Sequence, residues 1–183
     1  MGLFGTKKQQ EAPVSPMKQE LHGAQLALLK QMLAAPNADT PEHLLDRVFS
    51  PGILSDEEQA EFLRELKQEK ADMVEFVYST GSDRIFHFAG MYDVLPAQYQ
   101  PLTHEGNEAA FFFDLFLRNG ILLNRNGKRQ PDGDIEYPCS FSGIGFTMID
   151  DVYNNFVHFE VDQPSQRKAL AQMLKDLILR EAG

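Results

Sequence analysis

The stretch DMVEFVYSTGSDRIFHFAGM, residues 72–91, decides the fold class, because the period of the apolar residues changes there from helical to extended. Phe76 and Tyr78 fall on the same face of an extended segment, with other residues alternating between them. The turn formers at 80–83 then lead into a second alternating segment at 84–91. The pattern predicts a β-hairpin.

Three helices are predicted before this hairpin. Ser15 and Thr40 are each followed by a proline, which is the pattern of an N-cap and a first helical turn. Ser55 with Glu58 three residues later forms a capping box. Apolar residues recur at helical spacing after each signal. The expected helices cover residues 16–35, 41–49 and 55–70.

After the hairpin, the sequence EAAFFFDLFLRNG (108–120) predicts an amphipathic helix that ends at Asn119-Gly120. Phe111 and Leu115 project away from its main apolar face, and an exposed apolar patch of this kind is typical of a subunit interface. The alternative is that Phe111 packs under the loop at 92–105. The expected inner face consists of Ala109, Phe112, Phe113, Phe116 and Leu117.

Strand patterns return in the C-terminal half. Asn126-Gly127 is a strong hairpin-turn signal, and an amphipathic helix follows from Pro164 to the end of the sequence. Short turns favour antiparallel pairing. The sequence therefore predicts an α+β fold: N-terminal helices, then a mainly antiparallel sheet with the phenylalanine-rich and C-terminal helices packed on one face. The expected strands cover residues 121–124, 135–149 (one or two strands with a bend) and 155–161.

The chain length of 183 residues suits one well-buried core. Residues 1–15 lack apolar periodicity and are expected to form a flexible tail. Gly2 and Thr6 fit the N-myristoylation pattern, but a motif with two specified positions is weak, so a plain tail is the preferred interpretation. We expect a single α+β domain at 16–183, with a helical extension at 16–54 and a core at 55–182.

The net charge of −10 is concentrated in the body of the chain. Residues 1–35 hold four lysines and two glutamates, whereas the remainder holds 13 basic and 25 acidic residues. Such a surface repels nucleic acid and attracts basic protein surfaces. No apolar run reaches the roughly 18 residues of a membrane span, no signal peptide is visible, and Cys139, the single cysteine, fits a reducing compartment. We expect a cytoplasmic protein with a protein partner, no nucleic acid and no transmembrane segment.

Enzymatic chemistry has one candidate arrangement, in which Cys139 and one of His87, His104 and His158 form a nucleophile and base. The dispersed residues for it are His87, Cys139, His158 and the Asp150-Asp151 turn. A buried cysteine that packs as a small apolar residue is the preferred interpretation. The histidines lack zinc spacing and the aspartate turns do not follow the EF-hand pattern, so we predict no metal and no cofactor.

A basic cluster interrupts the acidic body and could seat an anion or an acidic partner segment; a solvated loop tip is the alternative. It consists of Arg118, Arg125, Lys128 and Arg129. With the apolar candidates and the acidic turn, the predicted partner-binding residues are Phe111, Leu115, Arg125, Lys128, Arg129, Asp150 and Asp151.

From Ser55 onward, the order helix, strands, helix, strands, helix on an acidic chain resembles the small homodimeric chaperones of type III secretion systems, over about residues 55–182. In that family the sheets and the helix between them form the dimer and the grooves for an extended effector segment. This chain adds two N-terminal helices and is less leucine-rich. The resemblance implies a homodimer and a non-catalytic protein-binding module of chaperone or adaptor type. A toxin-neutralising immunity protein belongs to the same class, and a small enzyme is the alternative.

Overall fold

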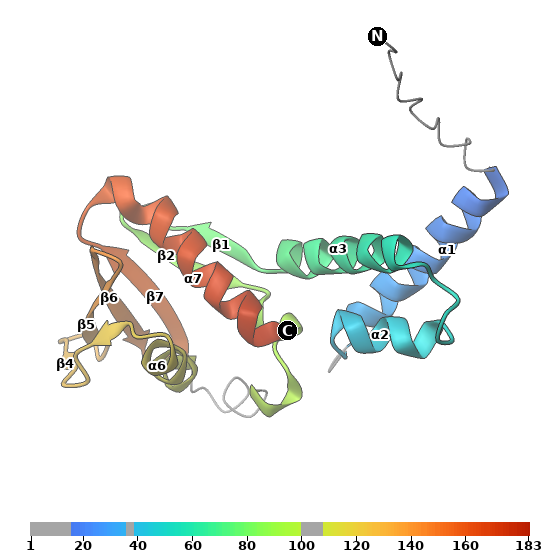
Figure 1. Cartoon of the computed structure of the whole chain (residues 1–183). Helices are drawn as coiled ribbons and strands as arrows, with labels where there is room; N and C mark the ends of the chain where they lie inside the picture. Colours follow the sequence, from blue (N-terminus) through green and yellow to red (C-terminus); the bar gives the residue numbers. More distant parts are fainter. Residues whose placement is uncertain (1–15, 36–38, 100–107) are drawn as a thin grey trace, which may run out of the picture.

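The computed structural model describes residues 16–35, 39–99 and 108–183, and within them the chain is an α+β fold (Figure 1). The predicted tail at 1–15, the Ser15 cap and part of the 92–105 loop, including His104, lie outside the described residues. Helices come first, and a single antiparallel sheet with helices on one face follows. The predicted fold class is confirmed. None of the helices in the described segments is long and apolar enough to cross a membrane.

The three predicted N-terminal helices are present. Thr40 accepts a hydrogen bond from the His43 amide, and Ser55 and Glu58 complete the capping box in both directions. The buried side chains of the three helices form a separate hydrophobic cluster, which includes Leu29, Leu44 and Phe62. The helices are α1 (Pro16–Leu33), α2 (Pro41–Val48) and α3 (Asp56–Met73).

Seven strands form the sheet in the order β1-β2-β7-β6-β5-β3, with β4 pairing beside β3 on the outer edge of β5. Every pairing is antiparallel, and β1 with β2 is the hairpin that residues 72–91 predict. The strands are β1 (Glu75–Tyr78), β2 (Ile85–Ala89), β3 (Leu122–Leu123), β4 (Lys128–Arg129), β5 (Ile135–Phe141), β6 (Ile144–Asp151) and β7 (Phe156–Val161).

One turn prediction needs correction. Asn126-Gly127 does not close a hairpin, because β3 and β4 both pair with β5 rather than with each other. Gly127 instead makes room for a close approach: a Cβ there would lie 2.5 Å from the Tyr137 ring. The 135–149 segment is two strands joined at Ser142-Gly143, where both residues have positive φ, as a tight two-residue hairpin requires.

Two long helices cover one face of the sheet. Phe112 and Phe116 of α6 (Glu108–Arg118) lie 4.9 Å and 6.3 Å, ring centre to ring centre, from Phe159 of β7. Leu170, Leu174 and Ile178 are fully buried on α7 (Arg167–Ala182). Short turns complete this layer: α4 (Met91–Val94) and two 3-10 turns, η1 (Ala97–Tyr99) and η2 (Pro164–Gln166).

The inner face of α6 is rotated from the predicted one. Its buried positions are 108, 109, 111, 112, 115 and 116, so the helical template begins at Glu108, while Ala109, Phe112 and Phe116 are buried as predicted. Leu117, expected inside, is 66% exposed. Phe111 and Leu115, expected outside, are fully buried, and Phe111 packs edge-on against Tyr99 at 5.4 Å. The alternative that placed Phe111 under the 92–105 loop is therefore the correct one.

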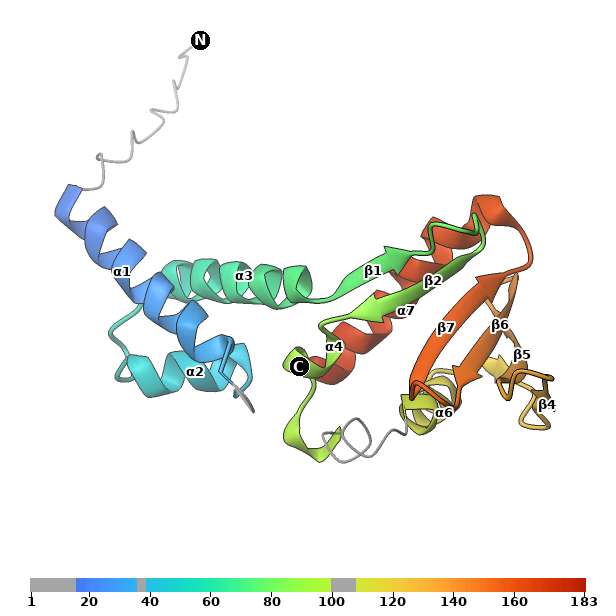
Figure 2. The ribbon, with the colours of Figure 1, turned by 180° about the vertical axis from the view of Figure 1, so that it is seen from behind.

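The buried residues fall into two clusters, one among α1–α3 and one between the sheet and its helices. The α3 helix packs with α1 and α2, although the predicted division at residue 55 joined it to the sheet; that division stays a prediction. At the end of α3 the buried Lys70 amine donates to the Ala182 carbonyl of α7. The C-terminal end of α7 lies beside this end of α3 (Figure 2).

Candidate functional site

The sheet has one covered and one bare face. Residues opposite one another in an antiparallel register share a face, and the row Phe86, Phe159, Met148 lies under α6 and α7. The neighbouring residues along the same strands point to the other side, where the described chain places no helix. In Figure 2, β1, β2 and β7 lie in front of α7, so this side of the sheet is in view.

The side chains of the bare face are more apolar than a solvated face requires. Val77, Ile85, Ile149 and Phe156 lie on it, and all are partly exposed. A sheet face that only meets water normally carries polar residues at these alternate positions. We call this surface the bare face. It comprises Glu75, Val77, Ile85, His87, Ala89, Glu136, Pro138, Ser140, Gly145, Thr147, Ile149, Asp151, Phe156, His158 and Glu160.

An aromatic cluster lies near its centre. The Phe156 ring lies 4.5 Å from His87 and 4.6 Å from His158, centre to centre and edge-on to both, and the imidazoles are 6.0 Å apart. Partial burial lowers the pKa of both histidines; the neighbouring His158 lowers the pKa of His87 further, while Asp151 and Asp134 act against the effect at His158. Both imidazoles are therefore neutral at neutral pH.

Beside this cluster lies a groove of about 460 Å³. Asp134, the residue directly before β5, lines this groove. Desolvation and the charges of Asp132 and Asp151 raise the pKa of its carboxyl. Apolar walls with a few converging polar groups are typical of binding sites. The groove is lined by Tyr78, Ser79, Thr80, Ile85, His87, Asp134, Ile149 and His158.

The candidate catalytic residues do not come together. Cys139 pairs in register with Phe146, and Asp150 with Val157, so both lie on the covered face, whereas His87 and His158 lie on the bare face. Burial raises the pKa of the Cys139 thiol to about 12, and the thiol donates to the Tyr137 carbonyl at 3.2 Å. A protonated thiol on the far side of a sheet is not poised to act as a nucleophile for these histidines.

The predicted partner-binding residues are also separated. Phe111 and Leu115 belong to the core and offer no surface. Lys128 pairs with Glu136 on the bare face, whereas Arg129 lies on the covered side and donates to the Gly133 carbonyl at 3.1 Å.

Of the other charged candidates, Arg125 lines a second groove beside Phe113 and Leu117. Arg118 is held by Asp114 and Glu181. The basic residues are therefore not one anion site. Asp151 is on the bare face, where Asn154 donates to its carboxylate.

One buried acidic residue, Glu108, was not predicted from the sequence. Glu108, at the start of α6, is buried and accepts a hydrogen bond from the Val157 amide at 3.2 Å and one from the Tyr92 side chain. Desolvation raises its pKa to about 7 despite these bonds. The helical spacing of the buried residues would have predicted Glu108 on the inner face of α6 if that face had been permitted to include a charged residue.

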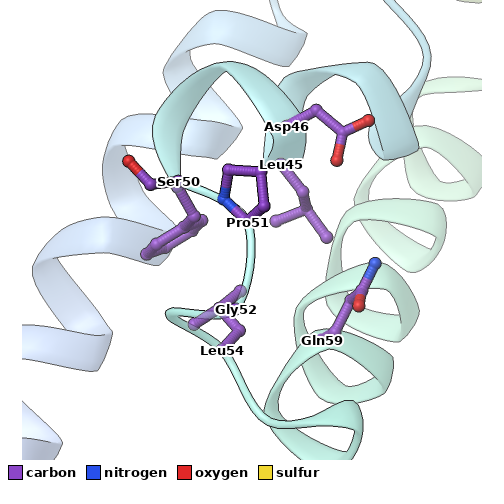
Figure 3. A pocket seen from close by; sticks show the side chains of 8 residues that line it. Leu45, Asp46, Ser50, Pro51, Gly52, Leu54 and Gln59 are labelled. Atoms are coloured by element: carbon purple, nitrogen blue, oxygen red, sulfur yellow. The ribbon is translucent and has the colours of Figure 1, made fainter.

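A smaller hollow lies among the N-terminal helices (Figure 3), at the turn that follows α2. Its volume of about 60 Å³ is enough for water molecules but not for a larger ligand. Asp46 is the one ionisable residue that lines it. The lining is Leu45, Asp46, Phe49, Ser50, Pro51, Gly52, Leu54 and Gln59. We therefore take the bare face as the candidate site.

Within residues 16–35, 39–99 and 108–183, no group of three or more His, Cys, Asp or Glu side chains is placed to hold a metal ion. Comparison with known proteins gives no match to a family model, to a curated protein or to a solved structure.

Proposed function

We propose that the protein is a non-catalytic protein-binding module and that the bare face is its docking surface. The observation that carries this proposal is the presence of partly exposed apolar and aromatic side chains on a sheet face that none of the described helices covers. Interfaces differ from ordinary surface mainly by aromatic residues in a core that is depleted of charge. Phe156 between two neutral imidazoles supplies such a core, and acidic residues surround it.

A partner that covers the bare face gains binding free energy from the burial of apolar side chains. Burying an exposed apolar side chain completely contributes about 1.5–3 kcal/mol, and Val77, Ile85, Ile149 and Phe156 each have part of that still to gain. A partner therefore gains most from contacting the centre of the face, with the charged rim contributing orientation and association rate.

Chaperones, immunity proteins and adaptors would differ in what binds to the bare face. In a chaperone of the type III secretion kind it is an extended effector segment, in an immunity protein it is the folded surface of a toxin, and in an adaptor it is either. We place this activity in the cytoplasm, on the basis of the single thiol, Cys139, in an acidic chain.

Site-specific photo-cross-linking tests the proposal. A photoreactive amino acid at Val77, which is 37% exposed on the bare face, is compared in living host cells with one at Gln172, which is exposed on α7. We expect a discrete adduct with another protein from position 77 and none from 172. The same adduct from both positions, or an adduct from 172 alone, would contradict the proposed docking surface.

A second copy of the chain is the other partner to test, because α1 exposes an apolar stripe. Leu21 and Leu28 on its outer side are 59% and 48% exposed. The charged residues of α1 are Lys18, Glu20 and Lys30, whereas the equally long α3 carries ten: Asp56, Glu57, Glu58, Glu61, Arg64, Glu65, Lys67, Glu69, Lys70 and Asp72.

Sedimentation velocity tests this homodimer. A dimer that Leu28→Glu separates, and that Glu61→Gln on α3 leaves intact, supports pairing through α1. A monomer at every accessible concentration rules it out.

A further inference from the structure

We infer that the occupant of the bare face is a basic, extended protein segment, and that protonation of His87 and His158 releases it in acid. This inference rests on the proposed docking function and adds the charge of the partner and a control by pH. It combines the charge distribution around the face with the position of two imidazoles at its centre.

The rim of the bare face is acidic. It holds two cations: Arg84 lies 3.6 Å from Glu160 and donates to the Val161 carbonyl at 2.7 Å, and Lys128 stands opposite Glu136 in the register. Asp162 lies over Gly145, where a Cβ would meet its carboxylate. The rim carboxylates therefore outnumber the cations by four. They are Glu75, Asp134, Glu136, Asp151, Glu160 and Asp162.

The centre of the face suits a cationic side chain, arginine in particular. The Phe156 ring lies on the face between two neutral imidazoles, and aromatic faces attract guanidinium groups. Asp134 lines the adjoining groove and supplies a carboxylate that a guanidinium can engage with two parallel hydrogen bonds. Desolvation, and then the charges of Asp132 and Asp151, raise the pKa of Asp134, and an arriving cation relieves the repulsion among these carboxylates.

An extended segment matches the shape of this surface. The face spans parallel rows of side chains from β1 to β5, and the groove runs from the β1–β2 end to Asp134. A strand-like segment presents every second side chain to one side. A segment whose facing side chains, at every second position, are by turns basic and apolar would thus meet the carboxylates and the Val77, Ile85 and Ile149 side chains in turn.

In acid, protonation of the two imidazoles makes the centre of the bare face positively charged. Both histidines have a lowered pKa, so the face keeps its full negative charge at neutral pH. Two protons would halve the excess of four negative charges and place positive charge against a basic occupant. The groups nearest the imidazoles are Val77 of β1, Ile149 and Asp151 of β6, Phe156 and Glu160 of β7, and Asp134; Glu136 and Lys128 follow in the cross-strand row of His158.

Two synthetic peptides test the inference with the full chain. Over about twelve positions both carry serine at every second residue, and the residues between alternate valine with a charged residue, which is arginine in one peptide and glutamate in the other. Amide chemical shifts, recorded by NMR at about pH 7.5 and about pH 5, report where and how tightly each binds. We expect the arginine peptide to shift β2 and β7 amides and to lose about tenfold in affinity in acid, and the glutamate peptide to shift nothing.

Matched variants separate this effect from general attraction. His87→Gln with His158→Gln should keep the arginine peptide bound at about pH 5, because no charge can then appear at the centre. Asp134→Asn with Glu160→Gln should weaken binding, whereas Glu57→Gln with Glu61→Gln on exposed α3 removes the same charge and should not. Equal weakening by the two carboxylate pairs would show general attraction only and would overturn the inference.

Failure of the inference can be told from failure of the proposed function. An arginine peptide that does not bind, a glutamate peptide that binds more tightly, or an acid release that persists in the His87→Gln, His158→Gln variant each overturns the inference. If cross-linking from Val77 captures a partner through an acidic or uncharged segment, the docking function stands and the basic occupant is wrong.

Discussion

The two faces of the sheet share the same strands but differ in almost every physical respect. On β2, Phe86 is fully buried and the next residue, His87, is partly exposed; on β7, Phe159 and His158 repeat the contrast. The covered face is filled by phenylalanine rings from the sheet and α6. The bare face holds two histidines, one phenylalanine (Phe156), smaller apolar residues and carboxylates. The contrast shows that alternation along a strand gives the sheet one buried, stabilising face and one partly exposed face.

Polar groups follow the same division. On the covered face Glu108 is buried and bonded to Tyr92 and Val157, and the Cys139 thiol is held protonated by burial. On the bare face the carboxylates remain near solvent and the imidazoles stay neutral. Substitutions on the covered face should therefore change the free energy of unfolding, and those on the bare face should change binding.

The largest effect is expected at the centre of the covered face. Phe112→Ala removes a fully buried ring that contacts Phe88 and Phe159, so the free energy of unfolding should fall by about 3–5 kcal/mol. Leu117→Ala on the exposed side of the same helix is the matched control and should cost less than about 1 kcal/mol. Urea denaturation measures both; similar losses in the two variants would mean that the assigned inner face of α6 is wrong.

The next effect is a pH dependence that originates at Glu108. Because its pKa in the folded protein is raised from 4.5 to about 7, the folded state holds this proton more tightly than the unfolded chain. Its contribution to stability is full below about pH 4.5 and is lost as the pH rises through about 7. The loss should amount to about 3 kcal/mol.

Urea melts across this range, on the protein and on Glu108→Gln, measure that loss. The glutamine keeps an oxygen that can accept from Val157 and carries no charge, so the variant should lose less stability between these pH values and be the more stable protein at about pH 8. A variant that is less stable than the parent at that pH would show that Glu108 is stabilising in its ionised form.

The smallest effect on stability is expected on the bare face. His87→Gln and His158→Gln should each change the free energy of unfolding by less than about 1 kcal/mol at about pH 7.5, because both side chains are partly exposed. The lowered pKa of each imidazole means that its folded-state contribution is full above about pH 6.5 and is lost as the pH falls. The variants should therefore lose less stability than the parent in acid, and a large loss at neutral pH would assign the pair to the core.

Much of the fold was predictable from local patterns. Caps at Thr40 and Ser55, the alternation in residues 72–91 and the C-terminal apolar stripe act within a few residues of chain, and each of these predictions is confirmed. The Asn126-Gly127 prediction was wrong because strand pairing is decided by β5, which comes later in the chain.

The candidate site was less predictable. Phe111 and Leu115 were assigned to the surface because a charged residue, Glu108, begins the true inner face of α6. His87 and His158 were recognised as strand residues, but only the register between β2, β7 and β6 shows that they meet across Phe156 on the side that none of the described helices covers. Which face of a sheet is covered depends on helices that are distant in sequence.

The central claim is that the bare face binds the partner. The most direct test is the affinity of the cross-linked partner for two variants that make the same change at exposed sites, Val77→Arg on β1 and Leu117→Arg on α6. We predict that Val77→Arg abolishes or strongly weakens binding and that Leu117→Arg retains the parent affinity, with both proteins folded by circular dichroism. Unchanged binding by Val77→Arg together with loss of binding by Leu117→Arg would contradict the account.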